Sequence, residues 1–381
     1  MKNVGVISMG IKAPIIREGD NLSEIVVNSV LESTWNPYSK EYEINDKDVI
    51  GITESVVARA QGNYVTIDEI AEEIKQKFNK PETIVIIKPI YSRNRFSMIL
   101  KAIARAAGKK IIIVMPEFDE VGNPRGVNPW TGVDIEQYYK DICINENKEV
   151  SIFYESYYYF HDEYIHDNNT VFLYCGLHNY EEWFEQYCPP EERVKEHYKH
   201  LTLANICSDK CEWGLLGSNK ASEEKLKLFP NKVKAQEFVE EVQRLIFEKT
   251  NKKVECLCYG DGCFKSPSNG RPGSSIWEFA DPVTCPAYTN GLEGSPNEIK
   301  LKAFADDKYK NLNGKELSEA IKKEIKENKN RSLKGEMTSQ GTTPRRYVDL
   351  LASLCDLTSG SGDRGTPIII VKNYFKNFST E

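Results

Sequence analysis

Residues 83–114, TIVIIKPIYSRNRFSMILKAIARAAGKKIIIV, decide the fold class of this 381-residue chain. The stretch opens with the apolar pattern of a buried strand at residues 83–87 and closes with another at residues 110–114. Between them, residues 97–107 have helical spacing, and Gly108 ends that helix. Two strands joined by a helix normally form a right-handed crossover with parallel strands. The sequence therefore predicts a βαβ unit in a mixed α/β protein.

Further strands extend this unit into a central α/β block that we place at residues 81–206. They are expected at residues 150–154 and 170–173, after a polar region. Arg93 and Arg95 follow the first strand of the block. They could grip an anion, or they could simply be solvated at the start of a helix.

The segments on either side of this block have a different character, so we expect two or three domains in all. Residues 1–80 are predicted to form a strand, a turn, a helix, a strand and a helix, with the first helix capped near Asn21 or Ser23. Residues 207–381 are the third part. Its expected elements are a helix at residues 234–250, a strand at residues 254–258 and a charged, solvated helical stretch at residues 300–330.

Composition argues against several classes of protein. The net charge of −7, with acidic and basic residues interleaved, speaks against a nucleic-acid surface. No run approaches 18 apolar residues and the N-terminus lacks the pattern of a signal peptide. We therefore expect a cytoplasmic protein with no membrane partner.

The ten cysteines of a chain without an export signal indicate reduced thiols rather than disulfides. Cys207 with Cys211, or Cys256 and Cys258 with Cys263, could instead supply a zinc site, although neither group has the spacing of zinc ribbons. The histidines are expected to be packed or at the surface. They are His161, His166, His178, His197 and His200.

Two polar glycine loops near the C-terminus indicate a phosphate site. They are TSQGTTPRR at residues 338–346 and TSGSGDRGTP at residues 358–367, and they flank an apolar helix at residues 347–357. Glycines let backbone N–H groups point at an anion, hydroxyls add donors or metal ligands, and arginine supplies a planar fork. Ordinary surface turns are the alternative, but two such loops around one helix favour a phosphate or a nucleotide.

A carboxylate also follows the strand at residues 254–258. Asp261 lies in Tyr259-Gly260-Asp261-Gly262, and an aspartate on a glycine turn after a strand suits a hard cation. An Asx turn or a hairpin would explain the same residues. A second strand, residues 48–52, leads into the polar loop 53–63 at a place where ligands often bind. No hydrolytic triad is evident, so nucleophilic hydrolysis is not favoured.

These motifs resemble the coenzyme F(420)-0:L-glutamate ligases, also called γ-glutamyl ligases, and in particular their longer bacterial branch. The resemblance rests on residues 6–20 and 48–62, on Ser218-Asn219-Lys220 and Gly291-Leu292-Glu293-Gly294, and on the loops just described. It covers about the first 75 residues and residues 250–375. It implies a γ-glutamyl ligase-like α+β fold with an enlarged central α/β block, and a homodimer.

The resemblance also implies a chemistry. Members of the family are acid–amino-acid ligases that use GTP and Mg²⁺ or Mn²⁺ to turn a carboxylate into an acyl phosphate, which the amine of L-glutamate attacks. The resemblance assigns metal binding to Asp261 and Asp134. It assigns the binding of phosphates or of the substrate carboxylate to Arg345, Arg346 and Lys220. The implied nucleotide contacts are Gly10, Ile11, Lys12, Ala13, Glu54, Ser55, Arg59, Ser359, Gly360, Ser361, Gly362, Asp363, Arg364 and Gly365.

This chain departs from the family pattern at several of these positions. Ser361 stands where the family has a metal-binding Glu, Arg59 stands where it has Lys, and the motif that ends in Asp134 is two residues longer. The acceptor could therefore be a folate-like or other small carboxylate, and the nucleotide could be ATP. A non-catalytic nucleotide- or metabolite-binding protein of the same fold is a further alternative. Arg345, Arg346 and Lys220 could each belong to a surface salt bridge instead.

Overall fold

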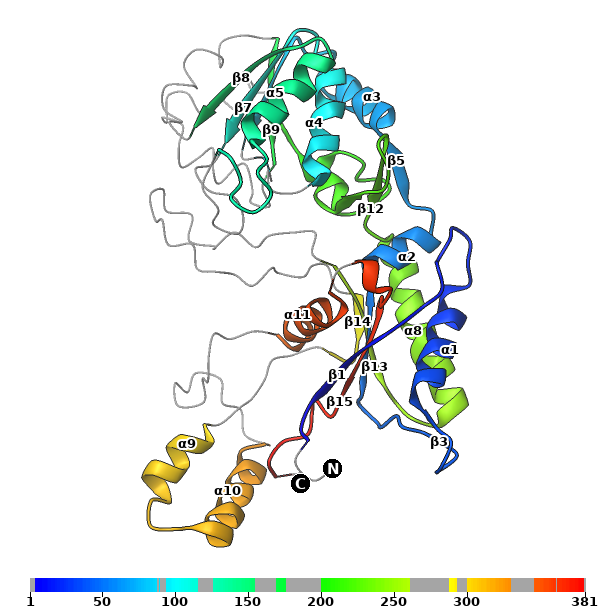
Figure 1. The fold of residues 1–381 in the computed structure, drawn as a ribbon, viewed down its shortest axis with the longest axis vertical. Coiled ribbons are helices and arrows are strands. Elements are labelled where there is room, and N and C mark those ends of the chain that lie inside the picture. The colour runs from blue at the N-terminus through cyan, green and yellow to red at the C-terminus, as the bar shows by residue number, and fades with distance from the viewer. Residues whose placement is uncertain are drawn as a thin grey trace.

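A computed structural model gives the three-dimensional structure of the protein. The described residues form two five-stranded sheets and two smaller sheets, together with helices that cover sheet faces (Figure 1). This arrangement confirms the mixed α/β and α+β class. The described residues are 4–87, 89, 94–115, 126–154, 169–175, 200–260, 288–292, 300–329, 346–360 and 362–379.

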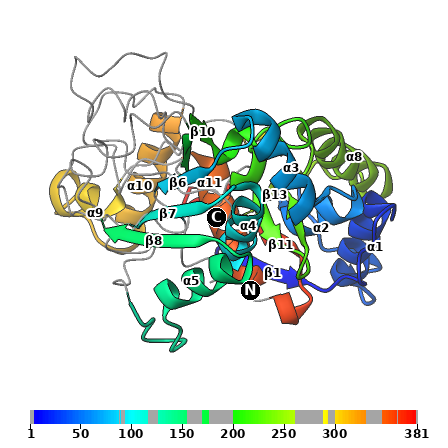
Figure 2. The same ribbon diagram turned by 90° about the horizontal axis from the view of Figure 1, so that it is seen from above.

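The central block contains a five-stranded sheet in which every pair of neighbouring strands is parallel. The predicted βαβ unit is confirmed, although its helix α4, Asn94–Ala106, begins three residues before the predicted start at residue 97. Figure 2 shows β6, β7 and β8 side by side. In spatial order the strands are β10 (His200–Thr202), β9 (Thr170–Tyr174), β6 (Thr83–Ile87), β7 (Lys110–Met115) and β8 (Glu149–Tyr154).

Helices and a third sheet complete this block. α3, Ile67–Phe78, starts with a capping box between Thr66 and Glu69, and its apolar face packs in the same core as α4. α5, Ile135–Asn145, connects β7 to β8. The three-stranded sheet has the order β11 (Ser218–Lys220), β12 (Lys225–Leu228) and β5 (Tyr64–Thr66).

Arg95 has a role that neither sequence interpretation included. Its side chain is buried, and Nη1 donates to the carbonyl oxygens of Leu216 at 2.8 Å and Ser218 at 3.1 Å. The guanidinium therefore ties the first turn of α4 to the backbone that enters β11. Arg93 lies outside the described residues.

The second five-stranded sheet, which we call the main sheet, is mixed. Its β4 and β13 are parallel, while its other neighbouring pairs are antiparallel. A short hairpin of β2 (Trp35–Asn36) and β3 (Glu41–Tyr42) precedes β4 and was not predicted. In spatial order the main sheet contains β1 (Ile7–Ile11), β15 (Ile368–Lys372), β4 (Val49–Thr53), β13 (Glu255–Tyr259) and β14 (Tyr288–Asn290).

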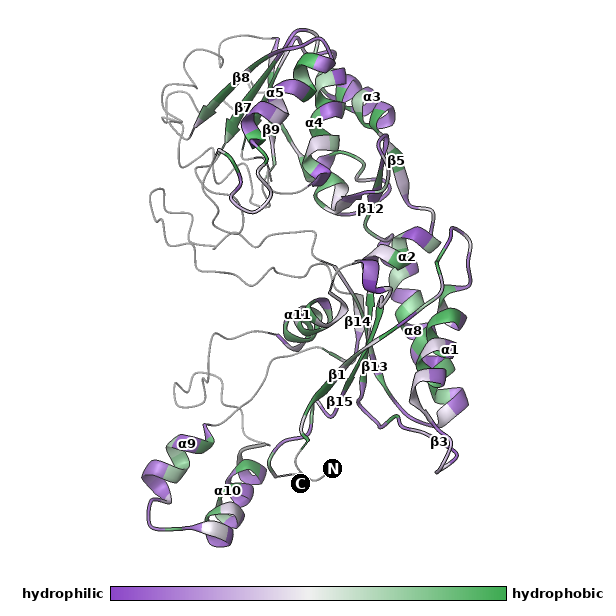
Figure 3. Cartoon of the chain, in the orientation of Figure 1, coloured by the Kyte–Doolittle hydropathy of each residue, from purple (hydrophilic) through white to green (hydrophobic). Residues whose placement is uncertain are grey.

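Both faces of the main sheet are covered by helices (Figure 1). Ile50 and Ile52 pack with α1, Leu22–Thr34, and α8, Lys232–Thr250. The alternate residues of β4 face α11, Tyr347–Ser359, on the other side. Figure 3 shows hydrophobic residues concentrated in these strands and in α11, as a two-sided core requires.

Gly51 lets α11 approach the main sheet closely. A Cβ atom at this position would lie 2.5 Å from Sγ and 3.2 Å from Cβ of Cys355 in α11. Real Cβ atoms do not come this near to a sulfur, so the absence of a side chain at residue 51 sets the distance between helix and sheet.

Two sequence interpretations need correction. Residues 53–63 are not a loop, because α2, Glu54–Ala60, begins directly after β4 with Thr53 as its N-cap. The stretch at residues 300–330 is helical but not uniformly solvated. Glu324 of α10, Gly314–Lys329, is buried and accepts hydrogen bonds from Lys308 and Tyr309, both at 2.6 Å. Ahead of α10 lie α9 (Leu301–Ala303) and a π-helix (Phe304–Lys308).

None of the helices in the described part of the chain combines the length and the apolar character needed to cross a membrane.

Candidate functional site

The register of the main sheet brings four strand ends to one edge. Ile368, the first residue of β15, pairs with Ile11 at the end of β1 and with Ile52 near the end of β4. Thr53 of β4 pairs in turn with Tyr259, the last residue of β13. We call this border, formed by Ile11, Thr53, Tyr259 and Ile368, the strand-end edge. Segments far apart in the sequence meet there.

Two of the predicted nucleotide segments lie side by side at this edge. The Ala13 amide donates to the Gly365 carbonyl at 3.2 Å. Farther from the edge, the hydroxyl of Ser8 in β1 contacts that of Thr358 in α11 at 2.7 Å. Thr366 donates to the carbonyl of Ser359 at 3.0 Å, which closes the second segment on itself. Gly10 and Ile11 belong to β1 rather than to a loop, and Ile11 is buried, so Lys12 is the exposed member of the first segment.

The second segment starts where α11 ends. Gly360 follows Ser359 with φ +62° and ψ −147°, a backbone conformation that essentially only glycine adopts. The next described residues, Gly362–Arg364, form a short 3-10 helix whose Asp363 and Arg364 are exposed. A charged, exposed turn thus stands at the strand-end edge, as a phosphate site needs.

Replacing Gly360 with alanine is expected to distort this turn. A Cβ atom would meet the Arg364 guanidinium at 3.0 Å, and the residue would hold a strained backbone conformation that costs about 1–3 kcal/mol. We expect a melting temperature lower by several degrees and weaker nucleotide binding. Gly362→Ala is the matched control, because nothing lies within 4 Å of a Cβ atom there. Equal melting temperatures for both variants would contradict this prediction.

A buried charge cluster begins at Glu54, directly after Thr53 of the strand-end edge. The side chains of Lys227 and Glu54 are only 7% and 3% exposed, and Lys227 Nζ lies 3.1 Å and 3.3 Å from the two carboxylate oxygens of Glu54. Asn219 Nδ2 donates to Glu54 Oε1 at 2.9 Å. Glu54 is the first residue of α2, which directly follows β4 of the main sheet. Lys227 and Asn219 belong to the three-stranded sheet. The cluster therefore joins two sheets at the strand-end edge.

Glu54 also packs against the end of β13. A Cβ atom on Gly260 would overlap the Glu54 side chain, so residue 260 has to be glycine for the carboxylate to reach Lys227. Burial raises the pKa of the neighbouring Tyr259 phenol well above its ordinary value, so this group stays neutral at physiological pH. Asp261, the next residue along the chain, lies outside the described residues.

The comparison with protein families concerns the chain as a whole. The model of the F420-0:Gamma-glutamyl ligase family matches residues 10–373, nearly the whole chain. The chain belongs to this ligase family. No match was found among curated proteins.

The structure places the other predicted residues of this ligase as follows. Arg59 and Ser55 are exposed on α2. Lys220 of β11 pairs with Glu223 at 2.7 Å, and Arg346 makes a two-pronged ion pair with Asp349 at 2.9 Å and 3.0 Å.

Asp134 lies in the central block, away from the elements of the strand-end edge. Its carboxylate caps α5 by accepting from the Gln137 amide at 3.1 Å. The predicted residues Arg345 and Ser361, most of the loop at residues 338–346, Cys263, four of the histidines and the side chain of His200 lie outside the described part of the chain.

The described residues do not form a metal centre of this ligase by themselves. Within them, no group of three His, Cys, Asp or Glu side chains lies close enough to hold a metal ion. Burial raises the pKa of the Cys211 thiol to about 11, and it raises the pKa of the Cys207 thiol further. Both thiols therefore remain protonated. Glu54 already binds Lys227 through both oxygens, which does not fit a metal ligand. A divalent ion would need Asp261 together with phosphate oxygens, a combination that suits Mg²⁺.

Lys227 is the main residue that sequence reasoning missed. It stands between Leu226 and Leu228 in a buried strand, where a lysine is unusual. This placement was the available signal. Asn219 was noticed only as part of the Ser218-Asn219-Lys220 motif, in which Lys220 was expected to act. Because side chains alternate along a strand, Asn219 and not Lys220 points to Glu54.

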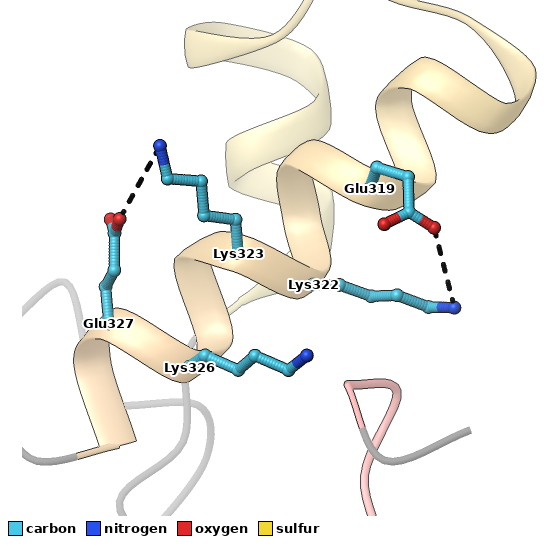
Figure 4. Close-up of a pocket in the computed structure, with 5 residues that line it drawn as sticks. All are labelled: Glu319, Lys322, Lys323, Lys326 and Glu327. Carbon is cyan, nitrogen blue, oxygen red and sulfur yellow. Dashed lines mark ion pairs between the residues drawn. The ribbon is translucent and has the colours of Figure 1, made fainter.

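A surface groove on α10 carries no comparable chemistry. Figure 4 shows that its lining comes from this one helix, with Lys322 paired to Glu319 at 4.0 Å and Lys323 to Glu327 at 3.8 Å. Such pairs at three- and four-residue spacing are typical of an exposed helix face.

Proposed function

We propose that this chain is a nucleotide- and divalent-metal-dependent ligase that forms a γ-glutamyl amide through an acyl phosphate. Membership of the γ-glutamyl ligase family supports the reaction class. The observation that carries the proposal is the convergence of residues 10–13, 54–59 and 359–365 on the strand-end edge. Lys12, Arg59 and Arg364 are exposed in these segments and bring positive charge to this edge, as an anionic ligand requires.

The chemistry suits these residues. Phosphoryl transfer to a carboxylate brings two anions together, so cationic side chains and a metal ion must neutralise the developing charge. In our proposal Arg59, Lys220, Arg345 and Arg346 provide the cations. Asp261 would provide a carboxylate for Mg²⁺ or Mn²⁺, which supplies Lewis-acid stabilisation of the phosphates when bound. Asp134, which caps α5 in the central block, would have to leave that cap and reach the strand-end edge to act as a second ligand. Lys220 and Arg346 would first have to exchange their present carboxylate partners for the ligand.

The substrates follow from the family. We propose L-glutamate as the amine donor, coenzyme F420-0 as the first acceptor to test, and GTP or ATP as the nucleotide, in a homodimeric cytoplasmic enzyme of F420 biosynthesis. Folate-like and other small carboxylates are the second group of acceptors. A non-catalytic nucleotide-binding protein of the same fold is the competing proposal, because Ser361 replaces a metal-binding Glu.

The test is phosphate release in a mixture of nucleotide, Mn²⁺ or Mg²⁺, glutamate and acceptor. The proposal expects release that stops when any one component is left out, together with a product heavier by one glutamate. Arg345→Ala is expected to slow release, and unchanged turnover would remove this residue from the mechanism. Tight nucleotide binding with no release for any acceptor would favour the non-catalytic alternative.

Metal binding can be tested directly in a crystal soaked with nucleotide and Mn²⁺. We expect an anomalous signal beside Asp261. A signal elsewhere would contradict the role assigned to this aspartate.

A further inference from the structure

Lys227 crosses from one sheet to another to meet a single carboxylate. It comes from β12 of the three-stranded sheet, and its ammonium contacts both oxygens of Glu54 at the strand-end edge. Removing two charges from water is costly, and a buried ion pair is often no more stabilising than an apolar pair of the same size. Stability alone therefore gives a poor reason for this pair to stand at the strand-end edge.

Glu54 lies against the backbone that leaves β13. It follows Thr53, which pairs with Tyr259, and its side chain passes over Gly260 without room for a Cβ atom. Because Lys227 and Asn219 hold the far end of this side chain, the carboxylate keeps one position above Gly260. The backbone at Gly260, just after the paired end of β13, is thereby held against the first residue of α2.

A second lysine on the same strand shows that this contact is specific. Lys225 lies two residues before Lys227, on the same side of β12, but it is exposed and stands over the Tyr64 ring at 5.6 Å from the centroid. Lys225 is the exposed first residue of β12, whereas residues 226–230 are all buried. Within this buried run, Lys227 has the Glu54 carboxylate as its partner.

We propose that Lys227, assisted by Asn219, is a positioning residue of the ligand site. It holds the Glu54 carboxylate over Gly260 and so positions the backbone that leaves β13 for a complex of divalent metal and nucleotide. Lys227 does not itself touch the ligand. The inference rests on the proposed function, because it assumes that the strand-end edge binds this complex.

The rival explanation is that the pair only fastens one sheet to the other. To separate the two, Mn²⁺ binding is measured by electron paramagnetic resonance with a non-hydrolysable GTP analogue, and in parallel with an ATP analogue. The full-length proteins compared are the unmodified chain, Lys227→Met, Asn219→Ala and the matched control Lys225→Met. Circular dichroism sets a temperature at which each protein is folded.

A positioning role predicts that Lys227→Met weakens Mn²⁺–nucleotide binding roughly 10- to 100-fold, the usual loss when a residue that orients a site is removed. Asn219→Ala, which removes one hydrogen bond to the carboxylate, should weaken it about fivefold. Lys225→Met should bind like the unmodified protein. A fastening role would change stability but leave the affinity of the folded protein unaltered.

Each outcome decides the matter. Unchanged affinity in a folded Lys227→Met protein overturns the inference and leaves the proposed function intact. If Lys227→Met does not fold, Asn219→Ala decides, because this side chain is only half-buried and its loss should be tolerated. Unchanged affinity there would also overturn the inference. If the unmodified protein binds neither complex, the proposed function fails and this inference fails with it.

Discussion

Lys227→Met is expected to lower the free energy of unfolding by about 3–5 kcal/mol, the usual cost of removing one partner of a buried ion pair. The variant keeps the volume of the side chain but leaves the Glu54 carboxylate, only 3% exposed, without the ammonium that contacts both of its oxygens. Urea denaturation followed by circular dichroism measures the change.

Two further variants test the cause of this loss. Lys225→Met removes a lysine from the same face of the same strand, and we expect it to cost under about 1 kcal/mol because it loses only an exposed contact with Tyr64. Adding Glu54→Gln to Lys227→Met removes the unpaired charge and should restore much of the lost stability. A double variant no more stable than Lys227→Met alone would show that packing, not charge, explains the effect.

Gly51→Ala is expected to destabilise the protein by about 1–3 kcal/mol through overpacking of the core between β4 and α11. The added methyl group would lie 2.5 Å from Cys355 Sγ, and β4 is a central strand of the main sheet with little freedom to move. The easier response is an outward shift of α11, which would carry the turn at Gly360 with it. We therefore expect weaker nucleotide binding as well as a lower denaturation midpoint.

Cys355→Ala should relieve part of this clash. It removes the sulfur and leaves the Cβ atom of residue 355 at 3.2 Å, still tight but within reach of a small adjustment. The four proteins of the double-mutant cycle should show a favourable coupling of about 0.5–3 kcal/mol between the two substitutions. If the losses of stability in the two single variants simply add, Gly51 is needed for its backbone conformation rather than for the close approach of α11.

The sequence predicted the elements that depend on local pattern. The continuous apolar runs of β6 and β7 and the helix between them followed from hydrophobic spacing. The cap of α1 was expected near Asn21 or Ser23, ahead of a periodic apolar run, and the side chain of Asn21 is the one that caps the helix. Such features need only a few neighbouring residues, and these lie together in the chain.

Features that depend on distant partners were missed. Side chains alternate along β12, so Lys225 and Lys227 point to the same side of the strand, yet of these two only Lys227 is buried. Its partner Glu54 is 173 positions away in the sequence. The residues of α2 were predicted to be a loop, because Thr53 and Glu54 look like the polar end of a strand. The structure shows instead that Thr53 caps a helix by accepting a hydrogen bond from the Ser55 amide. The strand-end edge itself could not be derived without the order of strands in the main sheet.

The pairing of β1 with β15 has a consequence for how the protein is made. Ser8 of β1 and Thr358 of α11, whose hydroxyl groups touch, are 350 positions apart. At about 5–20 residues per second, the ribosome needs on the order of 20–70 s to make the chain between them. The central sheet, whose strands all lie within residues 83–202, has its sequence complete earlier. A newborn chain can therefore have all the strands of the central sheet while β1 still lacks its partner, and the strand-end edge forms only when β15 has been made.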